Sequence, residues 1–67
     1  MMQVKVNGEM RKIDENSTLY DVIHSLSLEE RVMAAALNMQ IVKKDSWNSA
    51  VLNDGDVIEL LDFVGGG

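Results

Sequence analysis

Few side chains in this 67-residue chain could act as nucleophiles, bases or metal ligands. There is no cysteine and a single histidine, His24, so neither a disulfide nor a structural zinc site is expected. Asp54 and Asp56 flank Gly55, and the chemistry of a tight turn explains all three residues. His24 has no evident partner and is expected to face solvent. These residues predict that the chain has no catalytic side chains of its own.

The chain ends in DFVGGG, and this glycine end is the other feature that could take part in chemistry. Glycine is used where the backbone must pass where no side chain fits. Taken alone, three final glycines are more typical of a flexible tail with no role. Their position directly after an apolar strand, in so short a chain, favours an end that enters another protein's site.

Charge and length narrow the possible classes of protein. The chain has six basic and eleven acidic residues and a net charge of −5, which argues against nucleic acid as a partner. It has no apolar run of transmembrane length and no signal-peptide pattern, so we expect no membrane partner and a cytoplasmic location. With 46% hydrophobic residues, a single folded domain is expected rather than disorder.

The first half of the chain predicts a hairpin followed by a helix. Residues 2–7 alternate in polarity as a half-buried strand does, and Asn7-Gly8 is a strong hairpin turn. In the returning strand, Ile13 and either Met10 or Arg11 are expected to cover the edge of the core. Apolar residues at helical spacing then predict a short helix over 19–26. A capping box between Thr18 and Asp21, or a cap by Ser17, is expected at its start. The helical stripe consists of Leu19, Val22, Ile23 and Leu26.

The second half predicts three more strands and a loop. RVMAAALN favours a strand, although its alanines would also suit a helix. As a strand it is apolar on both faces, with Val32, Ala34 and Ala36 on one and the alternate residues on the other. A turn at Asn38 leads to a short strand at 41–42, and Trp47 is expected to anchor the loop that follows. A turn over 53–56 begins the last strand, 57–64, in which Leu61 and Phe63 share a face.

This order of elements predicts an α+β fold. Two hairpin arms and one helix make a roll in which a mixed sheet of four to five strands packs on the helix. The first and last strands are expected to lie side by side, in parallel, at the centre. We expect the folded domain to span 1–64 and a flexible glycine tail to span 65–67.

The chain resembles the thiamine-biosynthesis sulfur carrier (ThiS) family of ubiquitin-like β-grasp proteins, and the resemblance covers essentially its whole length. An IV pair with basic residues, then a Trp, a DGD turn, an apolar strand and terminal glycines are typical of that family. The family commonly ends in two glycines, whereas this chain ends in three. The small subunit of molybdopterin synthase is usually longer and lacks the Trp region. The matching residues are Ile41, Val42, Lys43, Lys44, Trp47, Asp54, Gly55, Asp56, Ile58 and Leu60.

The resemblance implies a carrier protein that is a substrate of enzymes. It implies that an adenylating (ThiF-like) enzyme uses ATP to activate the terminal carboxylate of Gly67, and that no cofactor is bound by the chain itself. Sulfur from an enzyme such as a cysteine desulfurase would displace AMP and leave a thiocarboxylate. A thiazole synthase (ThiG-like) would receive the sulfur. Gly65 and Gly66 would thread the partner's site.

Docking residues and three rival functions remain as expectations from the sequence. Leu61 and Phe63, beside the alanine face with Ala34 and Ala36, are expected to form a partner-facing apolar patch. Glu59 and Asp62 could orient a basic partner. The rivals are a sulfur carrier for another acceptor (molybdopterin or an amino acid), a ubiquitin-like modifier joined to lysines, and an interaction module with an inert tail.

Overall fold

The computed structural model describes residues 1–62, with the backbone alone at Asp62, and the segment 63–67 lies outside the described residues. The order of elements matches the predicted one, with a 3-10 helix added inside the predicted loop. The elements are β1 (Met2–Val6), β2 (Glu9–Ile13), α1 (Leu19–Ser25), β3 (Val32–Leu37), β4 (Gln40–Val42), the 3-10 helix η1 (Lys44–Ser49) and β5 (Val57–Asp62).

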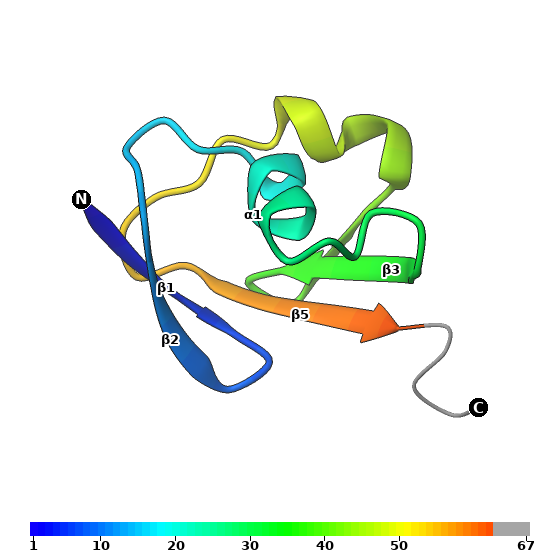
Figure 1. The fold of residues 1–67 in the computed structure, drawn as a ribbon, viewed down its shortest axis with the longest axis horizontal. Coiled ribbons are helices and arrows are strands. Elements are labelled where there is room, and N and C mark those ends of the chain that lie inside the picture. Colours follow the sequence, from blue (N-terminus) through cyan, green and yellow to red (C-terminus); the bar gives the residue numbers. More distant parts are fainter. Residues whose placement is uncertain (63–67) are drawn as a thin grey trace.

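The sheet has five strands in the order β2-β1-β5-β3-β4 (Figure 1). β1 and β5 run parallel at the centre, and the neighbouring pairs β1–β2, β3–β4 and β3–β5 are antiparallel. The helix α1 covers one face of this sheet (Figure 1). The predicted α+β roll, with first and last strands adjacent, is therefore confirmed.

The first hairpin turns at Asn7 and Gly8, whose φ angles of 50° and 87° are both positive, as a two-residue type I′ turn requires. Val4 and Val6 of β1 are buried, and Ile13 packs against the core as predicted. The expectation for Met10 is wrong. Met10 pairs with Lys5, whose side chain points away from the core, and is 57% exposed. Arg11 is also exposed, although it pairs with the buried Val4, because β2 is an edge strand of the sheet.

The helix α1 begins at the predicted capping box. Thr18 Oγ1 accepts a hydrogen bond from the Asp21 backbone N–H at 3.1 Å, and Asp21 Oδ2 accepts one from the Thr18 N–H at 2.9 Å. Each bond satisfies a donor that the first helical turn leaves unpaired. Leu19, Val22 and Ile23 are buried against the sheet, which stabilises a helix too short to stand alone.

A β-bulge in β3 alters the predicted alternation of its side chains. The pairing with β5 shifts between Val32 and Ala34, so that Met33 is the extra residue. Val32 and Ala35 are both buried, whereas Met33 is 63% exposed. The predicted grouping of Val32 with Ala34 and Ala36 is therefore wrong at Val32, and that of Met33 with Ala35 and Leu37 is wrong at Met33.

Trp47 is a core residue, as predicted. It lies on η1 and is buried, and its Nε1–H donates to the Val42 backbone carbonyl at 3.0 Å. A buried indole needs such an acceptor for its one polar group. The bond ties η1 to the end of β4.

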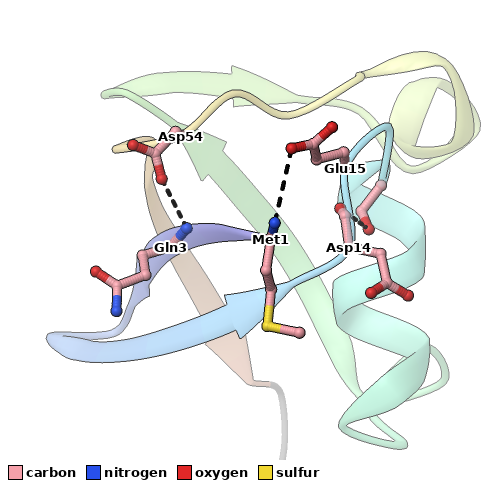
Figure 2. Close-up of polar contacts among 6 residues, drawn as sticks. Met1, Gln3, Asp14, Glu15 and Asp54 are labelled. Carbon is pink, nitrogen blue, oxygen red and sulfur yellow. Dashed lines mark hydrogen bonds and ion pairs between the residues drawn. The ribbon is translucent and has the colours of Figure 1, made fainter.

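The turn before β5 is bound to β1. Gly55 has a φ of 89°, which a side chain would disfavour. Asp54 Oδ1 accepts a hydrogen bond from the Gln3 backbone N–H at 2.8 Å (Figure 2), and the Gly55 N–H donates to the Gln3 carbonyl at 2.7 Å. The two bonds to Gln3 fix where β5 starts relative to β1. The Met1 amino group pairs with Glu15 (Figure 2), at a separation of 3.6 Å.

Candidate functional site

The candidate site lies at the end of the central strand β5. The residues predicted to react or to thread a partner's site, Gly67, Gly65 and Gly66, lie outside the described residues, as does Phe63. The structure instead shows the strand that leads to them. Ile58 and Leu60 are buried against α1 and hold β5 in the core.

The side chain of Asn7 forms two hydrogen bonds with β5 near this end. Its Oδ1 accepts a hydrogen bond from the Leu60 N–H at 2.8 Å, and its Nδ2 donates to the Leu60 carbonyl at 3.3 Å. Sequence reasoning assigned Asn7 only to the hairpin turn. Nothing in the local pattern shows that a turn residue reaches a strand 53 positions away, so this role was missed.

Asn38 holds the other end of β5 in a similar way. Its Oδ1 accepts from the Val57 N–H at 2.9 Å, and its Nδ2 donates to Asp56 Oδ1 at 3.0 Å. Asp56, which is buried, also accepts from the Asn53 N–H at 2.7 Å. Asp56 therefore joins its own turn to the turn at Asn38, and these hydrogen bonds satisfy both oxygens of the buried carboxylate.

The predicted patch residues Ala34, Ala36 and Leu61 lie together on the sheet face opposite α1. Ala34 pairs with Leu61 across β3 and β5, and Ala36 with Glu59. The face is hollowed rather than flat. It forms a groove of about 400 Å³, because the short alanines lie between larger neighbours. Its outward-facing lining consists of Asn7, Ala34, Ala36, Ile41, Glu59 and Leu61.

The groove combines an apolar rim with one acidic group. Ile41 on one side is 71% exposed and Leu61 on the other is 64% exposed, values typical of an interaction surface rather than a core. Glu59 contributes a carboxylate within the groove. Such a surface fits a partner that offers an apolar contact and a basic residue.

His24 is exposed, as predicted, but it does have a partner. Its Nδ1 lies 2.5 Å from Glu29 Oε2, and its ring stacks on Tyr20 with centroids 5.6 Å apart. A hydrogen bond from the Glu29 backbone N–H, and secondly the one to His24, lower the pKa of Glu29 from its ordinary value of 4.5. This cluster lies on α1 and the loop after it, and it shares no residue with the groove.

Another hollow, of about 450 Å³, is lined by residues of β2, the loop after it and α1, and not by β5.

Across residues 1–62, no three His, Cys, Asp or Glu side chains are grouped as a metal ion would require. Within the same residues, no helix has the length and hydropathy needed to cross a bilayer.

Comparison with known proteins agrees with the family resemblance. The family model described as the ThiS family matches residues 4–67. A solved structure of a thiamine biosynthesis protein (ThiS) from Geobacter metallireducens superposes with a TM-score of 0.79 and 28% identity, covering 98% of this chain and all of that one. The β-grasp fold is thereby confirmed.

Two curated relatives extend the comparison. A sulfur carrier protein ThiS of Bacillus subtilis is 32% identical over 96% of this chain and 98% of its own length. A thiazole synthase of Paramagnetospirillum magneticum is 35% identical over 98% of this chain but only 20% of its own length. The chain thus spans a fifth of the thiazole synthase and nearly all of the carrier.

Proposed function

This chain belongs to the ThiS family, and from that premise we propose that it is a sulfur carrier protein of thiamine biosynthesis whose Gly67 carboxyl group carries the sulfur. The observation that carries the proposal is a family match running from residue 4 to residue 67, which includes the glycine end. The chain acts as a carrier, not as a catalyst. The reactions on it are performed by partner enzymes.

A carboxylate needs activation before sulfur can replace one of its oxygens, because direct attack would have to expel oxide. In the proposed sequence, an adenylating enzyme joins the Gly67 carboxylate to the AMP part of ATP and releases pyrophosphate. A persulfide of the sulfur-donating enzyme then displaces AMP and forms an acyl disulfide. Attack of a thiol on the enzyme's sulfur breaks the S–S bond, which releases the thiocarboxylate and leaves a disulfide on the enzyme side. With no cysteine in the chain, no side chain offers an alternative place for a persulfide.

The glycines suit entry into an enclosed ATP site. Three extended residues reach roughly 10 Å, enough to pass a carboxylate through a channel while the domain stays outside. A Cβ on Gly66 would make the segment wider than a narrow channel allows, and it would restrict the φ angle of this residue. β5, held at both ends by asparagine side chains, provides a fixed base for this extension.

The proposed partners are an adenylating enzyme, a sulfur-donating enzyme such as a cysteine desulfurase, and a thiazole synthase. Support for the last comes from the P. magneticum thiazole synthase, which contains a segment similar to this chain. The groove between Ile41 and Leu61 is the proposed docking face, since its exposed apolar rim flanks the strand that leads to the glycines. A cytoplasmic location stays a prediction, consistent with the need for ATP.

The experiment that tests the proposal adds one alanine after Gly67. Purified wild-type chain should support release of pyrophosphate from ATP by the adenylating enzyme, and the extended chain should not, because its Gly67 carbon is now an amide. Equal urea unfolding curves for the two proteins are the control. Equal pyrophosphate release by both would contradict the proposal.

A further inference from the structure

The parallel pairing of β1 with β5 stops at the hairpin. Lys5 N–H donates to the Asp56 carbonyl and Asn7 N–H donates to the Ile58 carbonyl, each at 3.0 Å. In a regular parallel ladder the next bond would run from the Leu60 N–H to the backbone carbonyl of Asn7. The chain turns at Asn7 instead, where φ is 50°, so that carbonyl is not available on the line of the strand.

The amide of the Asn7 side chain takes the place of the missing peptide unit. Its Oδ1 receives the Leu60 N–H, and its Nδ2 donates to the Leu60 carbonyl, as the next residue of a longer β1 would. In the part of the chain that the structure describes, these two bonds are the β1-side hydrogen bonds to β5 beyond Ile58.

The other side of β5 is irregular at the same level. The pairing of β3 with β5 shifts between Val32 and Ala34, so the bulge at Met33 lies opposite Leu61 and Asp62. A bulge leaves an extra residue unpaired and bends the strand. The last described residues of β5 therefore depend more on the bonds from Asn7 than a regularly paired central strand would.

From these contacts we propose that Asn7 is a positioning residue for delivery of the glycine end. By extending the β1–β5 ladder through its side chain, it fixes the position of β5 at Leu60, close to the last described residues of the strand. The inference rests on the proposed function, and it assigns to the hairpin turn a part in the reactions at Gly67. Asn7 contacts no reacting atom.

A positioning residue of this kind changes the fraction of docked carrier–enzyme complexes in which the glycine end occupies the enzyme's active site. Two partly buried hydrogen bonds are worth about 1 kcal/mol or more, so their loss should lower the equilibrium ratio of held to released ends about fivefold. The fraction of held ends falls by the same factor when they are the minority. Docking through the apolar rim would continue. The expected signature is therefore a lower kcat, and a change in KM alone is not expected. Some change in KM can accompany the fall in kcat, because Asn7 also lines the groove.

Three variants separate this role from general stability. Asn7→Gly removes the side chain and keeps the positive φ. Asn7→Asp is the conservative change, since it keeps the acceptor for the Leu60 N–H. Asn38→Gly is the matched control, because Asn38 also lies in a positive-φ turn, with a φ of 51°, and its side chain accepts from the Val57 N–H at the opposite end of β5.

The first measurement is amide hydrogen exchange of the free proteins. Asn7→Gly should speed exchange at Leu60 about fivefold relative to the amides of the β1–β2 hairpin. Asn38→Gly should speed it at Val57 and leave Leu60 unchanged, and Asn7→Asp should keep Leu60 protected. Unchanged exchange at Leu60 in Asn7→Gly would overturn the assignment whatever the partner enzymes do.

The second measurement is carrier-dependent pyrophosphate release by the adenylating enzyme, at a temperature where all variants are folded. We expect kcat to fall about fivefold for Asn7→Gly, to recover in part for Asn7→Asp and to stay unchanged for Asn38→Gly. Equal kcat values for Asn7→Gly and Asn38→Gly would overturn the assignment, and so would a rise in KM alone. Wild-type chain that releases no pyrophosphate would instead refute the proposed function.

Discussion

At the scale of single residues, a few side chains connect parts of the chain that the backbone alone would leave separate. Trp47 fills the core from η1 and bonds to the end of β4. Asp56 joins the turn before β5 to Asn38. The burial of Trp47 followed from its size and apolar character. The hydrogen bonds of Asn7 and Asn38 could not be predicted from the sequence, because they depend on a sheet register that no local pattern contains.

The lowered pKa of Glu29, caused first by a backbone hydrogen bond and then by the contact with His24, predicts a small dependence of stability on pH. The folded-state pKa of Glu29 is lowered, so its contribution is fully present above its ordinary value of 4.5 and is lost as pH falls through the folded-state pKa. Glu29→Gln should reduce the free energy of unfolding at pH 6, and this difference from wild type should shrink at pH 3. Urea unfolding at both values measures it.

Glu30 supplies the control for that experiment. It is the neighbouring exposed carboxylate, and Glu30→Gln should leave the same unfolding curves nearly unchanged. A loss in Glu29→Gln that stayed constant between the two pH values would show that the side chain acts through packing rather than through its charge.

At the scale of elements, local signals predicted the hairpins, the capped helix and the order of strands. Alternation in β1, the Asn7-Gly8 turn and the Thr18 capping box each have a local cause, and each was confirmed. The bulge in β3 was not predicted, because it depends on how β3 meets β5. One inserted residue was enough to place Val32 on the face opposite to the expected one.

The second hairpin contains a residue with backbone strain, and a substitution can relieve that strain. Met39 has a φ of 73° and is 92% exposed, so it occupies a left-handed turn position without compensating contacts. Met39→Gly should raise the free energy of unfolding by about 0.5–1 kcal/mol, because a side chain in this conformation costs energy that glycine avoids. The change would appear as a higher urea midpoint.

Met10→Gly is the matched control for this effect. Met10 is also an exposed methionine, but it lies within β2, where glycine weakens a strand. It should lower the midpoint. A decrease for both variants would show that the turn at Met39 is not strained.

At the scale of the whole molecule, one helix covers one face of the sheet and leaves the other available. The apolar groove on that second face lies beside the strand that leads to the glycines. Strand alternation in the sequence predicted that its alanine, leucine and glutamate residues share this face, but it did not predict the depth of the groove. The groove arises from the pairing of short side chains in β3 with β5 and from Ile41 on β4.

Filling this groove should impair docking without unfolding the domain. Ala36→Arg places a long side chain between Ile41 and Glu59, where the opposite charge of Glu59 can hold it. We expect the KM of the adenylating enzyme for the carrier to rise at least about tenfold, with an unchanged urea midpoint. Gln3→Arg, an equal change on β1 outside the groove lining, should leave KM unchanged. A similar rise for both would show that charge alone, and not the groove, controls docking.

The central claim is that Gly67 carries the sulfur, and mass spectrometry of the terminal peptide tests it most directly. The chain is incubated with ATP, the adenylating enzyme, a cysteine desulfurase with cysteine as the sulfur source, and a thiol reductant, and is then cleaved after Lys44. The resulting peptide 45–67 contains no methionine. Replacement of one oxygen by sulfur should add about 16 Da, the same mass as oxidation of a methionine, which this peptide cannot undergo. We predict that fragment ions place the added mass on Gly67. An unmodified Gly67, or sulfur on any other residue, would contradict the account.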